Sequence, residues 1–212
     1  MKPVIAPRLK GRTFIARHGE TVFNAAARIQ GDVAHTPLTR AGFAQADEMG
    51  ATLRVWLGPR PALTLWSSPA GRALQTLAII AEHLELDWHA ARTDPRLAEM
   101  NVGEWSGLYH RDIAAAAGDF ADREAGLFRL RPPGGEWYDE IAVRLEDWLA
   151  EQPAGPDRLV VMHDISSRVL RGLLTGAPPR PECGAAVAER LAQGQAVEIE
   201  AGAERLISAD PS

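Results

Sequence analysis

The chain has 212 residues, of which 46% are hydrophobic and 24% charged, values typical of a globular protein with a sizeable core. They exclude a disordered or a collagen-like chain. The formal net charge is −5, the basic residues are scattered, and no apolar stretch approaches the roughly 18 residues of a membrane span. We therefore expect neither nucleic acid nor a membrane as a partner.

Length and cysteine usage indicate one domain in a reducing compartment. The length suits a single α/β domain, covering residues 1–212, better than two domains. Cys183 is the only cysteine, so an intrachain disulfide and a four-cysteine zinc site are impossible, and we expect an inert thiol. Residues 1–12 lack an apolar run of signal-peptide length. The sequence thus favours a cytoplasmic protein.

Three short β-favouring runs predict buried strands. They lie at residues 13–16, 63–66 and 159–162. Each ends abruptly in polar residues: Arg17 and His18 follow the first, Ser67 follows the second, and His163 follows the third. Each run therefore delivers polar side chains into a loop.

A helical pattern follows each predicted strand, with apolar residues at spacings of three and four. These patterns cover about residues 39–57, 71–84 and 166–174. Alternating strands and helices predict a mostly parallel sheet, and ligands of such sheets bind beyond the carboxyl ends of the strands. We therefore expect His18, residues 67–72 and His163 to share one rim of the sheet.

The remaining segments complete the predicted architecture. Residues 107–135 are alanine-rich, end in a Pro-Pro-Gly-Gly turn and precede a predicted helix at 137–150, so we interpret them as a small cap or lid. Residues 196–208 predict a terminal hairpin. The fold class is therefore an α/β three-layer sandwich, in which a mostly parallel central sheet is flanked by helices and carries a small helical cap insertion.

Two histidines and two arginines gather on the predicted rim and indicate a phosphate site. Arg17 adjoins His18, Arg72 opens a helix, and His163 ends the third strand. Guanidinium groups and a helix terminus favour a dianion, and phosphoryl transfer requires cations around an aligned nucleophile. A histidine considered alone is more often a hydrogen-bonded structural residue, so only the combination carries this hypothesis.

Several segments in this order resemble the histidine phosphatases, also called the phosphoglycerate mutase-like superfamily, from about residue 13 to residue 176. The matching residues are Arg17-His18-Gly19-Glu20-Thr21 with Asn24, then Gln30 and Gly31, Ser67-Ser68-Pro69 with Arg72, Glu99, and Val160-Val161-Met162-His163. The resemblance favours the phosphatase branch of the family. It implies His18, Glu99 and His163 as catalytic residues, and Arg17, Asn24, Gln30 and Arg72 as ligands of the phosphate or substrate.

Physical arguments give each catalytic residue a role. His18 must attack phosphorus through a neutral ring nitrogen; flanking cations would lower its pKa, and its other ring nitrogen should donate to a backbone carbonyl. We expect His163 to be the charged or proton-donating partner. Glu99 is the acid/base candidate, with a solvated or helix-capping carboxylate as its alternative. Asn24 could donate to phosphate or only bond within its loop, and the same holds for Gln30.

Two features depart from the family pattern. Asp164 follows the last histidine, where glycine is usual, and could cap the next helix. If its carboxylate instead faced a phosphate at about 6 Å, repulsion would be on the order of 3 kcal/mol, so we take capping as the arrangement compatible with activity. The segment 32–36 is about one residue longer than usual and carries His35 where aspartate is common.

The sequence thus predicts a metal-independent phosphomonoesterase that needs no cofactor and hydrolyses a small phosphorylated metabolite through a phosphohistidine on His18. One alternative is a phosphoglycerate mutase-type isomerase. This is less favoured, because Glu99 and His163 are 163 − 99 = 64 positions apart and the mutases carry a longer insertion there. The other alternative is a catalytically weak module that binds a phospho-ligand or phosphoprotein, as Asp164 would allow. The partner is a small phosphorylated substrate, with a homodimer as a further possibility.

Overall fold

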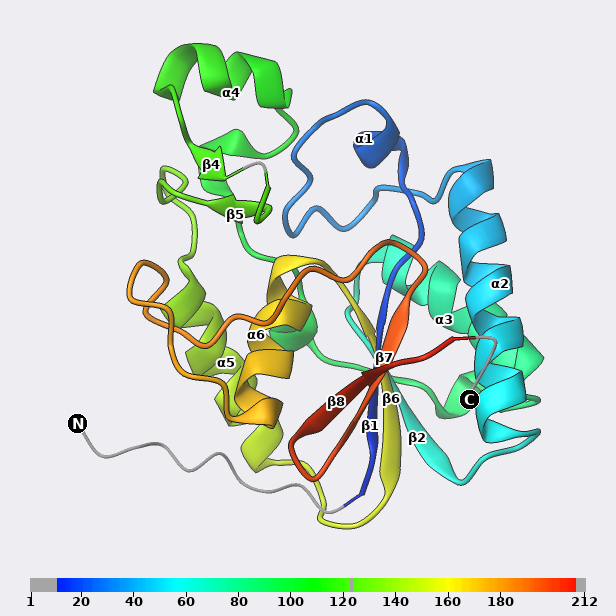
Figure 1. Cartoon of the computed structure of the whole chain (residues 1–212). Helices are drawn as coiled ribbons and strands as arrows, with labels where there is room; N and C mark the ends of the chain where they lie inside the picture. The colour runs from blue at the N-terminus through cyan, green and yellow to red at the C-terminus, as the bar shows by residue number, and fades with distance from the viewer. Residues whose placement is uncertain (1–10, 123, 209–212) are drawn as a thin grey trace.

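The computed structural model describes residues 11–122 and 124–208. Residues 1–10, on which the absence of a signal peptide was predicted, lie outside this part. A six-stranded sheet of order β3-β2-β6-β1-β7-β8 forms the centre of the molecule (Figure 1). Its strands are β1 (Thr13–Arg17), β2 (Leu63–Ser67), β3 (Arg92–Thr93), β6 (Asp157–Met162), β7 (Ala196–Glu200) and β8 (Ala203–Leu206).

The three strands predicted from sequence are neighbours at the centre of this sheet. β6 pairs in parallel with β1 on one side and with β2 on the other, and β3 extends the parallel part beyond β2. The predicted terminal hairpin is confirmed as β7 and β8, and β7 pairs antiparallel to β1. The sheet is therefore mixed and mostly parallel, so the ends of β1, β2 and β6 face the same rim.

Helices cover both faces of the sheet and give the predicted three layers. The helices α2 (Arg40–Leu57) and α3 (Gly71–His83) lie on one face, and α5 (Tyr138–Ala150) and α6 (Ile165–Thr175) lie on the other (Figure 1). Side chains of β6 alternate between the two cores, because successive residues of a strand point to opposite faces. Leu159 packs with the α2–α3 core, and Val160 packs with the α5–α6 core.

Smaller elements lie beyond the carboxyl ends of the central strands (Figure 1). The segment 107–135 contains α4 (His110–Ala117) and a two-stranded hairpin of β4 (Ala121–Asp122) and β5 (Leu127–Phe128), and the short helix α1 (Val22–Ala25) lies nearby. Aromatic contacts attach this segment to Trp105, which precedes it: the Trp105 ring lies 5.3 Å from that of Phe120 and 5.8 Å from that of Phe128. Single turns of 3-10 helix occupy Trp88–Ala90, Pro95–Leu97 and Gly103–Trp105.

Gly19 allows a close approach between the loop after β1 and the backbone of α2. A Cβ at Gly19 would lie 2.2 Å from the carbonyl oxygen of Gly42 in the first turn of α2, and a Cβ at Gly42 would lie 2.0 Å from the carbonyl oxygen of Glu20. Neither backbone can give way without moving α2, so both positions require glycine. The loop after β1 is thereby held directly against a helix. None of the described helices has the length and apolarity to cross a bilayer.

Candidate active site

The carboxyl ends of β1, β2 and β6 bring together residues that are far apart in the sequence. The backbone N–H of His18 donates to the carbonyl oxygen of Met162 at 3.1 Å, and the N–H of Ser68 donates to that of Val161 at 3.1 Å. The rings of His18 and His163 consequently lie 5.2 Å apart between centroids, at an angle of 66°. The prediction that one rim carries both histidines is confirmed.

The hydrogen bonds of His18 define which ring nitrogen carries the proton and which carries the lone pair. Its Nδ1 lies 2.7 Å from the carbonyl oxygen of Gly19, and because a carbonyl only accepts, Nδ1 carries the proton. Its Nε2 accepts from Nε of Arg72 at 3.2 Å. The expected bond from one ring nitrogen to a backbone carbonyl is therefore confirmed, and Nε2 is the atom with nucleophilic character.

Both histidines are buried and neutral. Burial lowers the pKa of His18 well below 6.5, and the charges of Arg72 and Arg17 lower it further. Burial lowers the pKa of His163 in the same way, and Arg72 again adds to the effect. The cations predicted to act on His18 do so, but removal from water is the larger cause.

These lowered pKa values predict a loss of stability in mild acid. Each of these histidines stays neutral in the folded protein but titrates near 6.5 in the unfolded chain. Below that pH the unfolded chain takes up a proton that the folded protein does not, so the free energy of unfolding falls by about 1.4 kcal/mol per pH unit for each histidine. Urea unfolding between pH 7.5 and 5 should show the sum of the slopes of His18 and His163. It should become shallower in His163→Gln and stay unchanged in a variant of exposed His89. Equal slopes in all three proteins would contradict the assignment.

Arg72 is fixed by the loop that follows Gln30. Its two terminal nitrogens donate to the carbonyl oxygens of Gly31 at 2.7 Å and Val33 at 2.6 Å, and to the hydroxyl of Thr36 at 2.8 Å. Its Nε–H points between the two histidines, at 3.2 Å from each ring nitrogen that accepts it. The segment 32–36, singled out as unusually long, thus positions the central cation of the site.

His163 differs from its prediction as a charged partner. Its Nδ1 accepts from Arg72, so this nitrogen is unprotonated, and its Nε2 donates to the hydroxyl of Ser68 at 2.7 Å. The ring is therefore a neutral tautomer in the unliganded protein. The charged alternative of the prediction is wrong for this state, because the ring is fully buried beside a guanidinium, while the proton-donating alternative stays a prediction.

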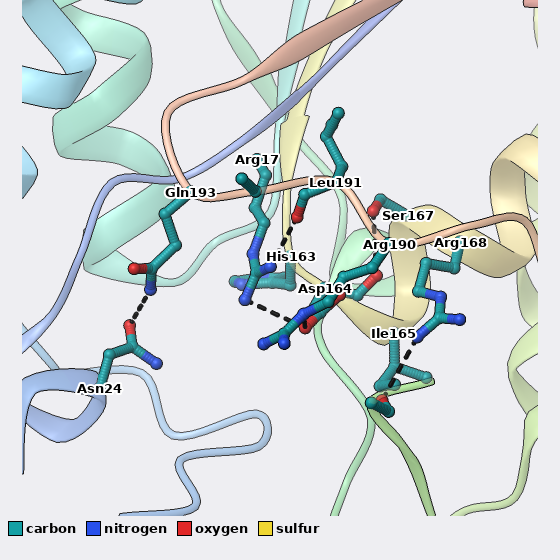
Figure 2. A network of polar contacts seen from close by, with 12 residues as sticks. Arg17, Asn24, His163, Asp164, Ile165, Ser167, Arg168, Arg190, Leu191 and Gln193 are labelled. Atoms are coloured by element: carbon teal, nitrogen blue, oxygen red, sulfur yellow. Dashed lines mark hydrogen bonds and ion pairs between the residues drawn. The ribbon is translucent and has the colours of Figure 1, made fainter. Parts of the chain in front are cut away.

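Arg17 is bonded to the loop before β7 and to the start of α6 (Figure 2). One terminal nitrogen donates to the carbonyl oxygen of Leu191 at 2.6 Å, and the other pairs with the carboxylate of Asp164 at 3.0 Å. Its buried Nε has no hydrogen-bond partner among the described residues. A buried donor without a partner is costly, so an anionic ligand that accepts from it would be stabilised.

Asp164 stands at the N-cap position of α6, but its side chain makes no capping bond. Its Oδ2 lies between two guanidinium groups, 3.0 Å from Arg17 and 3.1 Å from Arg190 (Figure 2). The capping prediction is therefore wrong: the side chain turns to the cations that the sequence could not place beside it. The large penalty expected for an isolated carboxylate does not apply, because two cations neutralise it.

Glu99 caps α6 in place of Asp164. Its carboxylate accepts from the backbone N–H groups of Asp164 at 2.9 Å, Ile165 at 3.1 Å and Ser166 at 2.9 Å, and from that of Met100 at 2.9 Å. The helix-capping alternative is thus confirmed. Burial raises the pKa of Glu99, and the charge of Asp164 raises it further, while the N–H bonds from Met100 and Ser166 oppose both. Its acid/base role stays a prediction.

Replacing Asp164 by asparagine tests the charge balance around Arg17. The change should lower the free energy of unfolding by about 3 kcal/mol, because it leaves a buried guanidinium without its counter-charge. Inorganic phosphate should then raise the melting temperature of the variant more than that of the wild type, since the dianion replaces the lost charge. Asp157→Asn breaks an ion pair with Arg12 outside the site and should show no such extra gain. Equal gains in all three proteins would contradict this account.

The side chain of Thr21 orients the two amides predicted to bind phosphate. Its hydroxyl lies 2.9 Å from Oδ1 of Asn24 and 2.9 Å from Oε1 of Gln30. Oδ1 of Asn24 also accepts from the Thr21 N–H at 3.0 Å and from Nε2 of Gln193 at 2.7 Å. Both amide oxygens are thus engaged in the loop, and both NH₂ groups remain to donate. Loop bonding and ligand binding are therefore compatible roles.

A cavity of about 740 Å³ opens beside Arg17 and Asn24. Its other lining residues come from the loop after α1 (Arg28), from the start of α4 (His110) and from the loop before β7 (Arg190 and Gln193). The two histidines themselves are buried, with His18 2% exposed and His163 fully covered. The cavity is therefore the open space next to a closed catalytic centre.

Sequence reasoning missed the segment 190–193. It contacts Arg17 through the Leu191 carbonyl, Asn24 through Gln193 and Asp164 through Arg190 (Figure 2). No motif marks it, because a backbone carbonyl and two common polar side chains make the contacts. Ser68 is also newly assigned as a partner of His163, although the Ser-Ser-Pro motif contains it.

The Cys183 thiol lies outside this chemistry. Cys183 is buried, and burial raises the pKa of its thiol to about 11, so it is unreactive near neutral pH, as expected. Within residues 11–122 and 124–208, no group of three or more His, Cys, Asp or Glu side chains is arranged to hold a metal ion.

Comparison with known proteins assigns the family. Residues 13–199 match the model of the histidine phosphatase superfamily, branch 1. The chain is 34% identical over 179 residues to "Probable phosphoglycerate mutase GpmB" of Yersinia pestis, an alignment that covers 81% of this chain and 78% of the relative. This chain therefore belongs to the histidine phosphatase superfamily, as its motifs indicate.

Solved structures of other proteins share the fold of this chain. The mycobacterial glucosyl-3-phosphoglycerate phosphatase in complex with VO₃ superimposes with a TM-score of 0.71 at 25% identity, covering 92% of this chain and 96% of that one. The protein TTHB049 of Thermus thermophilus superimposes with a TM-score of 0.60 at 26% identity, covering 89% and 93%. The fold is that of the histidine phosphatases, and the protein is an enzyme of phosphatase type.

Proposed function

We propose that the protein is a metal-independent phosphomonoesterase that hydrolyses a small phosphorylated metabolite through a phosphohistidine on His18. The observation that carries the proposal is the state of the His18 ring: Nδ1 is bound to the Gly19 carbonyl, so Nε2 carries the lone pair and meets Arg72, while the charge of Arg17 also acts on the ring. A neutral imidazole beside two guanidinium groups is suited to attack a phosphoryl group, because the cations neutralise charge on its oxygens.

Substrate binding requires one local rearrangement. In the unliganded protein the Nε–H of Arg72 is shared by the two histidines, which occupies the lone pair of His18. A phosphoryl oxygen is a charged acceptor and forms the stronger hydrogen bond with a guanidinium, so it draws this N–H away from the ring. The freed Nε2 then faces phosphorus, and the unpartnered Nε of Arg17 supplies a second N–H.

The reaction divides into two displacements. In the first, Nε2 of His18 forms a bond to phosphorus while the bond to the alcohol oxygen breaks, and the leaving oxygen takes a proton. In the second, water attacks the phosphohistidine, loses a proton, and releases inorganic phosphate with His18 restored. The Nδ1–H bond to Gly19 holds the ring in the same orientation in both steps.

Glu99 remains our candidate for moving these protons. Burial raises its pKa, which favours the protonated carboxyl that an acid catalyst requires. Its four backbone N–H donors favour the carboxylate, so donation requires at least one of these bonds to open when substrate binds. The charge of Glu99 acts on both Arg17 and Arg72, the two cations proposed to hold the phosphate.

Hydrolysis of p-nitrophenyl phosphate with and without a chelator tests the proposal. We expect turnover that EDTA leaves unchanged, and a panel of phosphorylated metabolites, assayed by phosphate release, should then identify preferred substrates. Loss of activity in EDTA that added divalent metal restores would contradict the metal-independent mechanism. Tight binding of phosphate without turnover of any compound would favour the binding-module alternative.

A phosphoglycerate mutase is the second candidate, because the Yersinia relative carries that name. The closed catalytic centre is compatible with it, since a mutase must keep water from the phosphoenzyme. Interconversion of 2- and 3-phosphoglycerate, stimulated by the bisphosphate, would support the mutase. Release of inorganic phosphate without interconversion supports the hydrolase, as does the similarity to a phosphatase over 92% of the chain.

A further inference from the structure

We infer that the substrate carries a second anionic group, which binds to Arg190 and Arg28 in the cavity beside Arg17. This inference rests on the proposed function, because it assumes that the reacting phosphate lies between Arg17 and His18. It names the substrate class: phosphomonoesters with a carboxylate or a second phosphate, as opposed to phosphomonoesters of neutral alcohols.

The composition of the cavity indicates an anion. Its lining contains three arginines, one histidine, three amide side chains and two alanines, and no carboxylate belongs to it. Its volume of about 740 Å³ is in the range of small-molecule sites and exceeds what one phosphate fills. In a chain of net charge −5, such a lining concentrates positive charge at one place.

Arg17 connects this cavity to the catalytic centre. It lines the cavity, and its charge also acts on the neighbouring His18. A substrate whose phosphate contacts Arg17 would therefore extend its other end into the cavity. Arg28 and Arg190 are the remaining cations of the lining and would meet that end.

Arg190 is available to bind a ligand. Its Nε pairs with Asp164 at 3.1 Å, which leaves its two terminal nitrogens without a hydrogen-bond partner among the described residues. Its side chain is 54% exposed, so these nitrogens can reach a ligand. Asp164 is shared with Arg17, so one carboxylate offsets two guanidinium groups and a net positive charge remains.

Arg28 is a rigid second contact. Its Nε donates to the carbonyl oxygen of Gly107 at 2.6 Å, and its guanidinium lies over the rings of Phe23, at 4.6 Å, and Tyr109, at 5.2 Å. No ion pair with a carboxylate is found for it in the described parts of the chain. A stacked guanidinium without a counter-charge is pre-organised to bind an anion.

Matched pairs of phosphate esters test the inference. 3-Phosphoglycerate and glycerol 3-phosphate differ by one carboxylate, and glucose 1,6-bisphosphate and glucose 6-phosphate differ by one phosphate. We expect the wild-type kcat/KM to favour the more anionic member of at least one pair by roughly tenfold, as is reasonable for partly exposed charge pairs. The pair with the larger ratio identifies whether the second group is a carboxylate or a phosphate.

Variants locate the preference within the cavity. Arg190→Gln should reduce the ratio to about two- to threefold, and Arg190→Lys should retain more of it because the charge is kept. Arg28→Gln is the second test and should also reduce the ratio. The matched control is Arg60→Gln, an exposed arginine paired with Glu85 outside the cavity, which should leave the ratio unchanged. Circular dichroism shows whether each variant is folded.

The outcomes separate this inference from the proposed function. Equal kcat/KM values within both pairs, or ratios unchanged by both cavity variants, would overturn the inference while the phosphatase proposal stands. If no ester is hydrolysed, the phosphatase proposal fails, and calorimetric titration of the same pairs then decides the inference. Tighter binding of the more anionic members, weakened by Arg190→Gln, supports it, and equal affinities overturn it.

Discussion

Substitution of His18 by alanine is expected to lower kcat/KM for p-nitrophenyl phosphate by about 10⁴-fold or more. In the proposed mechanism the side chain supplies the nucleophile, and without it the reaction would need direct attack by water in a site built around an imidazole. A loss of this size corresponds to about 5 kcal/mol of transition-state stabilisation. Steady-state assays of released nitrophenol measure it.

The control is a histidine outside the site. His89 is exposed on the 3-10 helix Trp88–Ala90, so His89→Ala should retain wild-type activity. The His18 variant should also retain the wild-type circular dichroism spectrum, because its ring accepts and donates within the site only. A folded His18→Ala protein with activity within tenfold of wild type would rule out covalent catalysis by this residue.

Replacement of Arg72 by lysine is expected to lower kcat/KM by about 10³-fold, although the formal charge is kept. Arg72 uses all three of its nitrogens, since one is directed at the histidines and two are anchored to the 31–36 loop. A lysine ammonium cannot reproduce this planar arrangement. Burial lowers the pKa of Arg72 itself to about 10, and a lysine in its place would lose its proton more readily. Loss of one preorganised donor commonly reduces turnover by 10² to 10³.

A second buried arginine provides the matched control. Arg158 is fully covered and donates to the carbonyl oxygens of Pro153 and Pro156, at the end of β6 away from the active site. Arg158→Lys should therefore lower stability without a comparable loss of turnover. If both variants lost activity equally, the effect of Arg72→Lys would be one of folding and not of catalysis.

Local patterns predicted the parts of the fold that form the active-site rim. The strands β1, β2 and β6 are short apolar runs with abrupt polar ends, and each precedes an amphipathic helix, so their type and order could be read directly. Parallel neighbours then place their carboxyl ends together, which brought His18 and His163 to one rim. The two-residue strand β3 and the one-turn helix α1 carry no periodic signal and were not predicted.

The details of the site depend on contacts between distant segments, which no local pattern encodes. Asp164 has the residue type and position of an N-cap, but Arg17 and Arg190 approach from elsewhere in the chain and bind its carboxylate. Glu99, 65 positions before Asp164, caps the helix instead. The neutral state of His163 likewise follows from burial beside Arg72, which sequence alone does not give.

Rapid quench of the enzyme during turnover of a ³²P-labelled phosphomonoester traps the proposed phosphohistidine. We expect a phosphorylated protein whose label is stable in base and labile in acid, maps to the peptide containing His18, and is absent from His18→Ala. Turnover without any labelled intermediate on the millisecond time scale, or label on another residue, would contradict it.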